Sequence, residues 1–394
     1  MNIKQLFYTH LAQTSSEPLA IEIEKAEGIY LYSPDGKRYM DLISGVSVSN
    51  IGHCHPEVVK AVQEQAAKYM HVMVYGEMVQ SPQVLLAKRL TELLPPQLDC
   101  VYFVNSGSEA IEGAIKLAKR FTQRTEIISC YNAYHGCTNG AMSIMGCDKF
   151  TRSFRPLMPD CTKIHFGKIS DIEKITTSTA AVIIEVIQGE AGIRSADKNY
   201  WQQLRNRCNE TKTLLVFDEI QTGFGRTGSL FAFEQIGIIP DILTLAKGMG
   251  GGMPIGAFIS SQKIMNCLTY EPVLGHITTF GGHPVSCAAA LAALEVIEKE
   301  KLYASVPKKA KLFSDLLSTM PNIKEFRQQG FMMAIEFDNP KYTFEVINTC
   351  LEKGLLTDWF LFCDSALRIA PPLIISEKEI ETACEIIKNS FRKY

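Results

Sequence analysis

A buried-strand pattern, a lysine and a run of glycines follow one another in the stretch Asp241-Ile-Leu-Thr-Leu-Ala-Lys247-Gly-Met-Gly-Gly-Gly-Met-Pro-Ile-Gly-Ala257. The glycines let the backbone pass close to a flat or charged group. The apolar neighbours of Lys247 reduce its hydration and lower its pKa, which makes the amine a better nucleophile toward carbonyls. Lys247 is therefore a candidate for Schiff-base chemistry. The structural alternative is a strand-end lysine whose amine reaches solvent.

Length and composition describe an ordinary globular protein with room for a large core. The 394 residues are 46% hydrophobic and 21% charged, and the length suggests two or more domains. The net charge of −2 gives no reason to expect nucleic acid or a membrane surface as a partner. The 12 cysteines form no C-x-x-C pair, and no apolar segment approaches a membrane span, so we expect a cytoplasmic protein. His53 and His55 lack further ligands, which indicates turn packing and no metal site.

Strand and helix patterns alternate at roughly 30-residue spacing through the middle of the chain. This alternation predicts an α/β fold with a mostly parallel sheet flanked by helices. The expected strands are 100–104, 125–130, 180–186, 214–217 and 241–246. The expected helices of this part are 57–69, 106–121 and 285–300.

The two ends of the chain are expected to form a smaller α+β domain. Residues 21–42 alternate apolar and polar side chains around Pro34-Asp35-Gly36, which predicts a hairpin without a core of its own. The C-terminal part alternates helical patterns with short strands. Those helices are 306–320, 342–353 and 377–391, and the strands are 332–337 and 366–370. We therefore divide the chain into an N-terminal segment of the small domain (1–50), a large domain (51–290) and a C-terminal small domain (291–394).

Polar and aromatic side chains follow several strands of the predicted sheet. Residues 105–110 (Asn-Ser-Gly-Ser-Glu-Ala) open a helix, and their N–H groups and hydroxyls suit a phosphate, although Ser is also a common helix cap. Tyr134 and His135 follow the next strand, Glu190 comes after 180–186, and Asp218 ends 214–217. Ligands of open α/β sheets bind at the carboxyl ends of the strands. One sheet edge is thus expected to carry a phosphate loop, an aromatic ring, carboxylates and Lys247.

Pyridoxal phosphate is the cofactor that needs all of these groups together. Its aldehyde forms a Schiff base with a lysine, and a carboxylate keeps its ring nitrogen protonated as an electron sink. Its phosphate takes N–H donors, and its ring takes a flat stacking partner. The sequence therefore predicts a pyridoxal-phosphate site.

At these residues the chain resembles the class III (ω-amino) aminotransferases, which are fold-type I pyridoxal-phosphate enzymes, and in particular their acetylornithine and ornithine branch. The likeness extends from Gly28-Ile-Tyr-Leu-Tyr32 to Leu367-Arg-Ile-Ala-Pro-Pro372. Its most specific part is Phe217-Asp-Glu-Ile-Gln-Thr-Gly-Phe-Gly-Arg-Thr-Gly228. The resemblance implies transfer of the terminal amino group of an amine or amino-acid donor to 2-oxoglutarate, which gives an aldehyde and glutamate.

The resemblance implies catalytic and ring-binding roles for three residues. Lys247 would form the Schiff base and then shuttle the proton between the substrate carbon and the cofactor. Asp218 would pair with the ring nitrogen, and Gln221 would hydrogen-bond the phenolic oxygen.

The resemblance also implies how the phosphate and the flat face of the ring are held. Gly107 and Ser108 would bind the phosphate, and Tyr134 would stack on the ring with His135 beside it. Thr279 matches a position that reaches the phosphate of the neighbouring subunit's cofactor. A homodimer with shared active sites follows from that match.

Glu190 and Arg368 match a pair that works as a switch in the family. The glutamate occupies the arginine while the amine donor is bound, and then releases it to grip a carboxylate of glutamate or 2-oxoglutarate. A bidentate arginine–carboxylate contact is strong enough to select such an acid. The alternative is a purely structural ion pair.

Two positions depart from the acetylornithine and ornithine branch. Cys137 stands where that branch has an arginine that clamps the donor's α-carboxylate, and Val46 stands where ornithine aminotransferases have a tyrosine. A thiol cannot make the bidentate contact. The donor either lacks an α-carboxylate, as the diamine putrescine and 4-aminobutyrate do, or another cation such as Arg152 or Arg155 substitutes.

Two other functions use the same fold. One keeps the cofactor but changes the reaction, as in an aminomutase of the glutamate-semialdehyde type or a decarboxylase; the pair Glu190 and Arg368 argues against it. The other is a catalytically silent binding protein, which the presence of Lys247 and Asp218 disfavours.

Overall fold

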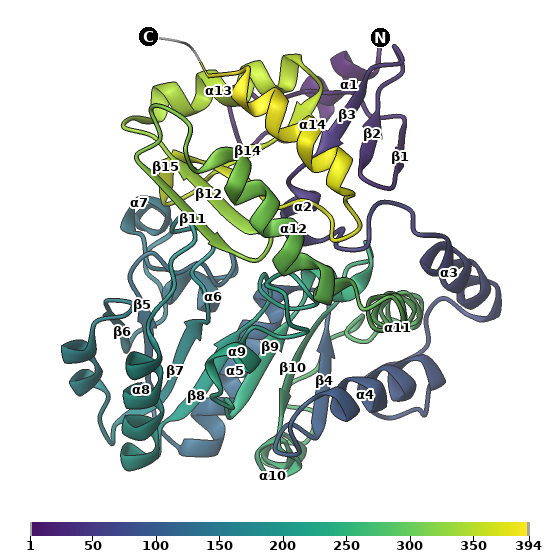
Figure 1. Ribbon diagram of the computed structural model, residues 1–394. Coiled ribbons are helices and arrows are strands. Elements are labelled where there is room, and N and C mark those ends of the chain that lie inside the picture. The colour runs from purple at the N-terminus through teal and green to yellow at the C-terminus, as the bar shows by residue number, and fades with distance from the viewer. Residues whose placement is uncertain (1, 392–394) are drawn as a thin grey trace.

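The computed structural model describes residues 2–391 and has a seven-stranded sheet at its centre (Figure 1). The strand order is β4-β10-β9-β8-β7-β5-β6. The strands are β4 (Cys100–Val104), β5 (Glu126–Cys130), β6 (Cys161–Ile164), β7 (Thr179–Glu185), β8 (Leu214–Asp218), β9 (Ile242–Leu245) and β10 (Gly256–Ser260). The run from β9 to β6 is parallel, whereas β10 is antiparallel to both β4 and β9. The predicted α/β class with a mostly parallel sheet is confirmed, and β6 and β10 are additions to it.

The middle of this sheet is the core of the large domain. Every residue of β7, β8, β9 and β10 is buried. Parallel strands covered on both faces have near-continuous apolar sequences, because neither face meets water. This explains why the strands were visible as apolar runs and not as alternating patterns.

Helices cover both faces of the sheet, and the three predicted ones begin and end close to the predicted residues. The helices of this part are α3 (Pro56–Lys68), α4 (Ser81–Leu93), α5 (Gly107–Thr122), α6 (Asn139–Ser143), α7 (Asp148–Thr151), α8 (Lys198–Thr211), α9 (Phe233–Ile236), α10 (Gln262–Met265) and α11 (Pro284–Lys299). Short 3-10 turns are η1 (Arg152–Phe154), η2 (Ile169–Lys174), η3 (Lys247–Gly250) and η4 (Asn266–Thr269). Helix α5 packs on β9, β10 and β7, and α11 packs on α3 and α4.

The N-terminal and C-terminal parts of the chain lie side by side above the central sheet, in purple and in green to yellow (Figure 1). One small sheet has the order β1-β2-β3-β13 and the other β11-β12-β15-β14. The strands are β1 (Lys25–Glu27), β2 (Tyr30–Tyr32), β3 (Arg38–Asp41), β11 (Glu325–Gln329), β12 (Met332–Glu336), β13 (Leu355–Leu356), β14 (Asp358–Phe360) and β15 (Cys363–Ile369). The helices are α1 (Ile3–His10), α2 (Ser44–Ser47), α12 (Leu302–Leu317), α13 (Pro340–Glu352) and α14 (Glu377–Lys388).

The hairpin forms as predicted, and its outer strand finds a partner near the C-terminus. Strands β2 and β3 are antiparallel, and β3 pairs in parallel with β13. Regular pairing begins at Lys25, later than the alternation from residue 21 predicts. The division at residues 50 and 290 stays a prediction. No helix within residues 2–391 combines the length and hydrophobicity of a membrane span.

A buried arginine joins three distant segments of the chain. Arg226 donates from its guanidinium to Asn50 Oδ1 and to the carbonyls of Phe331 and Pro371. Burial lowers the pKa of Arg226 to about 9. Because an unpaired buried charge is costly, these acceptors fix the N-terminal and C-terminal segments against the loop after β8.

The contact between α5 and the sheet predicts a sensitivity at Gly113. A Cβ at Gly113 would lie 2.2 Å from Cε1 of the fully buried Phe258. Overpacking costs about 1–3 kcal/mol, against the roughly 1 kcal/mol that Ala gains over Gly in a helix. We therefore expect Gly113→Ala to lower the free energy of unfolding in a urea titration. Lys116→Ala, at an exposed site on the same helix, should change it by less than about 0.5 kcal/mol. A stabilised Gly113→Ala protein would contradict this packing.

Candidate active site

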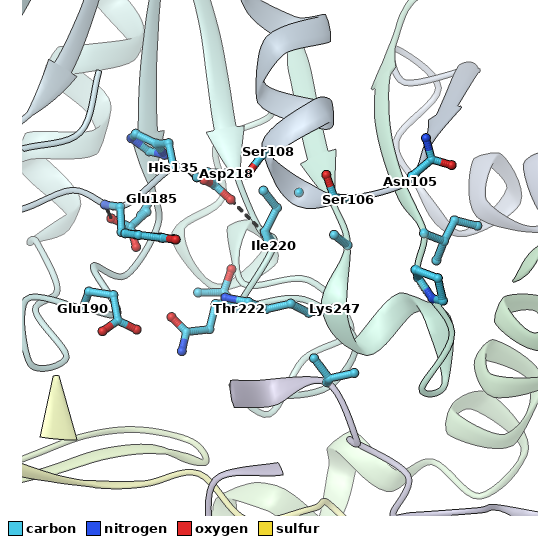
Figure 2. A pocket seen from close by; sticks show the side chains of 18 of the residues that line it. Asn105, Ser106, Ser108, His135, Glu185, Glu190, Asp218, Ile220, Thr222 and Lys247 are labelled. Carbon is cyan, nitrogen blue, oxygen red and sulfur yellow. Dashed lines mark hydrogen bonds and ion pairs between the residues drawn. The ribbon is translucent and has the colours of Figure 1, made fainter. Parts of the chain in front are cut away.

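A cavity of about 410 Å³ opens at the carboxyl ends of β4, β5, β7, β8 and β9 (Figure 2). Parallel strands deliver their following loops to one edge, which brings together residues that lie far apart in the sequence. The predicted residues that line it are Gly107, Ser108, Tyr134, His135, Glu190, Asp218, Gln221 and Lys247. Figure 2 shows His135, Asp218 and Ser108 along one side of the cavity, with Lys247 and Glu190 on the other.

Asp218 and His135 form a buried ion pair at the end of β8. Asp218 Oδ2 lies 2.7 Å from His135 Nδ1, and Asp218 Oδ1 accepts a hydrogen bond of 3.0 Å from the N–H of Ile220. Burial lowers the pKa of His135, but the Asp218 carboxylate outweighs this effect and the pKa is raised overall. His135 therefore holds the Asp218 carboxylate in a fixed orientation at the cavity wall.

Glu185 is a second buried carboxylate in the wall, and the sequence analysis did not single it out. It is the register partner of Asp218 across β7 and β8, so both side chains point to the same face of the sheet. Its oxygens accept hydrogen bonds from the N–H groups of Gly189 (3.0 Å) and Tyr134 (3.3 Å). Burial raises the pKa of Glu185 to about 7, although His135 acts to lower it. The sequence feature that could have identified Glu185 is its position at the end of an apolar strand, which it shares with Asp218.

The N-terminus of α5 faces the same cavity. Gly107 and Ser108 are its first two residues, and the first N–H groups of a helix have no acceptor within the helix. A Cβ at Gly107 would lie 2.9 Å from Ile220 Cδ1, and one at Gly136 would lie 2.3 Å from Ser108 Oγ. Because Gly107 and Gly136 have no side chains, the segments that carry Gly107, Gly136 and Ile220 lie close together around free N–H donors. This arrangement suits an anion.

Lys247 adopts a backbone conformation that is unusual for a side-chain-bearing residue. Its φ is 49°, in the left-handed region, and only Ala246 separates it from the end of β9. Such conformations cost energy and cluster at functional sites. Burial lowers the pKa of Lys247, and the carboxylates of Glu190 and Asp218 offset part of that change. The amine therefore gains nucleophilic character while it stays in the cavity wall.

Arg368 on β15 closes the site from the small domain. Its Nη1 and Nη2 each donate to one carboxylate oxygen of Glu190, both at 2.9 Å. Burial raises the pKa of Glu190, but Arg368 outweighs it and the pKa is lowered overall. A second cavity of about 310 Å³ lies against this pair and shares Tyr134, Glu190 and Lys247 with the first. The predicted pair thus stands between the large cavity and a second compartment.

Gln221 and Thr279 occupy very different positions. A Cβ at Gly189 would lie 1.9 Å from Gln221 Oε1, so the amide of Gln221 packs directly on that glycine at the cavity. Thr279 is exposed and lines neither cavity. Its carbonyl lies 2.9 Å from His71 Nε2. Within one described chain, Thr279 is therefore apart from the other predicted site residues.

Val46 and Cys137, the two positions that depart from the acetylornithine and ornithine branch, also differ in location. Val46 lines the second cavity with φ at 64°, which is strained for a β-branched residue. Cys137 is exposed and lines neither cavity. Arg152 and Arg155 are exposed and also lie outside both cavities. Among the described residues, the lysine and arginine side chains that line the two cavities are Lys247 and Arg368.

The histidine-rich turn is a packing feature of the N-terminal segment. His53 Nε2 lies 2.8 Å from Asp41 Oδ2, and His55 directly precedes α3. Both positions fit the turn packing that the sequence analysis predicts.

Comparison with known proteins defines the family. The family model for Aminotransferase class-III matches residues 11–391. The chain belongs to the class III aminotransferases. Among similar curated proteins, the acetylornithine aminotransferase of Methanocaldococcus jannaschii is 41% identical over 95% of this chain and 94% of its own. The acetylornithine aminotransferase of Clostridium acetobutylicum is 39% identical over 94% of this chain and 96% of its own.

A solved structure extends the likeness to three dimensions. The ornithine aminotransferase of Toxoplasma gondii superposes on this aminotransferase with a TM-score of 0.90 at 29% identity. The match covers 98% of this chain and 93% of the other, whose active site holds pyridoxal phosphate at partial occupancy. The predicted resemblance and fold type are therefore confirmed.

The cofactor of a class III aminotransferase is pyridoxal 5'-phosphate, and the residues present fit it. The cavity offers a partly dehydrated amine at Lys247, a buried carboxylate at Asp218 and the free N–H groups at the start of α5. Tyr134 supplies an aromatic ring at the cavity wall. An aldehyde, a ring nitrogen, a phosphate and a flat ring each find a matching group.

The ion pair of His135 predicts a pH dependence of stability. A group whose pKa is raised on folding stabilises the folded protein fully below its unfolded pKa, and this contribution is lost as the pH rises through the folded pKa. The charged neighbours of His135 are Asp218 and Glu185. We expect the free energy of unfolding of the wild type to fall as the pH rises above about 6.5.

The matched variant is His135→Gln, which removes the titrating ring and should show a shallower fall over the same range. Urea titrations of both proteins from about pH 6 to 9 measure the difference. Parallel pH profiles would show that the histidine is not held charged by Asp218.

Proposed function

We propose that this class III aminotransferase moves the terminal amino group of an acetylornithine- or ornithine-type donor to 2-oxoglutarate. The products are the aldehyde of the donor and glutamate. The bidentate contact between Glu190 and Arg368 beside Lys247 carries the proposal, because it offers an arginine to a substrate carboxylate only when the glutamate leaves. The acetylornithine aminotransferases at 37–41% identity support this donor type.

The chemistry divides between the cofactor and two side chains. When bound, pyridoxal phosphate supplies an aldehyde that condenses with amines and a ring that accepts an electron pair. Lys247 would hold the aldehyde group, and its free amine would take the proton from the amine-bearing carbon of the donor. The lowered pKa of Lys247, caused by its burial, leaves more of the amine free to act as this base. Asp218, held by His135, presents its negative charge to the ring nitrogen.

The remaining predicted residues hold the cofactor in place. Gly107 and Ser108 bind the phosphate at the start of α5, where the helix dipole also favours an anion. Tyr134 would stack on the ring, and Gln221 would donate a hydrogen bond to the phenolic oxygen. These roles rest on the shared cavity wall and on the resemblance of each position to the family.

Glu190 and Arg368 select the substrate of each half-reaction. While Glu190 pairs with Arg368, a carboxylate has no free cation there, and an amine donor can enter. When Glu190 turns away, Arg368 grips a carboxylate of 2-oxoglutarate with the same two N–H groups. One site thereby serves a donor and an acceptor of different charge.

We further propose that the enzyme is a cytoplasmic homodimer with shared active sites. Thr279 is exposed in the single chain and reaches the phosphate site of the partner subunit. Large apolar side chains in residues 70–85 and 273–280 are at least half exposed: Met70, Val79, Leu85, Val273 and Phe280. Surfaces of this kind mark protein interfaces.

A second candidate is a donor without an α-carboxylate, such as putrescine or 4-aminobutyrate. Cys137 favours it, because a thiol replaces the arginine that clamps the α-carboxylate in the resembled branch. Arg152 and Arg155 remain the alternative cations for an α-carboxylate, and like Cys137 they lie outside the two cavities of the described chain.

A panel of donors tests the proposal. N-acetylornithine, ornithine, putrescine and 4-aminobutyrate are each incubated with the enzyme and 2-oxoglutarate, and glutamate is measured. We expect glutamate from at least one terminal amine, and a rate about 10²–10⁴-fold lower for Lys247→Ala. Cys137→Arg should shift the ranking toward donors with an α-carboxylate, by roughly tenfold for one new bidentate contact. Glutamate from none of the donors contradicts the proposed function, and an unchanged ranking contradicts the role given to position 137.

A further inference from the structure

We propose that Arg327 is a positioning residue: it holds the loop that carries Glu190 against the small domain, and so limits how often Arg368 is free to bind a substrate carboxylate. The inference rests on the proposed function, in which Glu190 and that carboxylate compete for Arg368. Arg327 belongs to β11 and lies outside the walls of both cavities described above. Its influence on the site therefore passes through the loop.

The loop of Glu190 is short and closed. The backbone groups of Gln188 and Arg194 exchange two hydrogen bonds, of 2.9 and 3.1 Å, at its two ends. Inside the loop, the N–H of Gly192 donates to the carbonyl of Gly189 at 3.1 Å, and Glu190 lies between these two glycines. Short closed loops have few internal degrees of freedom. A contact that fixes Gly192 therefore also restrains Glu190.

Arg327 makes that contact from the small domain. Its Nε donates to the carbonyl of Gly192 at 2.5 Å, and its Nη1 donates to Glu336 Oε2 at 2.5 Å and also to Glu325. The side chain of Arg327 is 8% exposed. Hydrogen bonds from a charged donor are stronger than those between neutral groups, and the planar guanidinium offers several donors in a fixed geometry. One side chain thus joins the loop to two carboxylates of its own sheet.

The close approach of Gly192 to the small sheet is independent evidence for this restraint. Gly192 has a φ of 82°, which favours glycine. A Cβ at this position would lie 2.8 Å from Arg327 Nη2 and 2.9 Å from Cys363 Sγ. The loop therefore packs against β11 and β15 at a distance that leaves no room for a side chain.

The restrained loop keeps the Glu190 carboxylate next to Arg368. Besides its two contacts with Arg368, the carboxylate accepts a hydrogen bond of 3.0 Å from the N–H of Leu361. A tethered group competes at a high effective concentration, which falls when the tether loosens. A substrate acid binds only in the fraction of time in which the arginine is free, and its apparent affinity is reduced by that fraction. Loosening the loop should therefore tighten the binding of the acid.

The carboxylates that pair with Arg327 keep other cations when it is replaced. Lys324 Nζ lies 2.9 Å from Glu336 Oε1. Arg194 Nη1 lies 3.1 Å from Glu325 Oε2, and its Nη2 lies 3.2 Å from Glu336 Oε2. We therefore expect Arg327→Gln to fold, because no buried carboxylate is left alone. Since the Arg194 side chain is 41% exposed, its ion pairs restrain the loop less than the buried contact of Arg327.

Glutarate is the probe, because it has the two carboxylates of 2-oxoglutarate but no keto group that could react with the cofactor. Its Kd for the holoenzyme is measured by isothermal titration calorimetry. The proteins are the wild type, Arg327→Gln, Glu190→Gln, the double variant of these two, and Lys324→Gln. Lys324→Gln is the matched control, since Lys324 pairs with the same Glu336 and is 56% exposed.

We expect Arg327→Gln to bind glutarate about fivefold more tightly than the wild type, because the competing carboxylate is less firmly held. Glu190→Gln should also bind it more tightly, since it removes the competing charge. The double variant should match Glu190→Gln alone, because Arg327 acts through Glu190. Lys324→Gln should bind glutarate as the wild type does.

Unchanged or weaker binding in Arg327→Gln overturns the inference, and weaker binding would mark Arg327 as a purely structural residue. An equal gain from Arg327→Gln with and without the Glu190 carboxylate overturns it as well. Should Arg327→Gln fail to fold, Arg327→Lys takes its place with the same expectations, because lysine keeps the charge but lacks the planar fork. Failure of the proposed function is read separately: Glu190→Gln without any gain would show that Glu190 and the acid do not compete, and this inference would fall with it.

Discussion

The partial removal of water from the Lys247 amine is the constraint on which the rest of the site depends. A lysine in solution is mostly protonated, and its ammonium form does not add to an aldehyde, whereas burial lowers the pKa of this one. Burial is possible here because β9 is wholly interior and delivers Lys247 in a left-handed conformation directly into the cavity wall. The backbone strain and the desolvation of a charge are both costs that the surrounding core must outweigh.

The site also requires that charged side chains from distant segments of the chain lie close together without neutralising one another completely. Asp218 arrives on β8 and is held by His135 from the loop after β5. Arg368 arrives on β15 of the small domain and holds Glu190. The buried junction at Arg226 ties these parts of the chain together, so the geometry of the site depends on how the small domain is fixed to the large one.

Much of the fold and of the site could be predicted from the sequence, because buried parallel strands have apolar sequences. The residues that follow such strands lie at one edge of the sheet. Lys247, Asp218 and Tyr134 are predicted in this way, and the family resemblance adds Arg368. Glu185 was missed, because only the register of β7 against β8 shows that it shares a face with Asp218. Strand β10 had a visible apolar run, but its antiparallel place between β4 and β9 is a tertiary property.

The most direct measurement is to reduce the cofactor-loaded enzyme with borohydride, digest it and locate the modified peptide by mass spectrometry. Reduction makes the bond between a lysine and the cofactor permanent. The account predicts that the mass of the reduced cofactor is found on Lys247 and that the protein loses its visible absorption band. A modification on another lysine, or a cofactor released unmodified, would contradict the central claim that this buried amine holds the aldehyde.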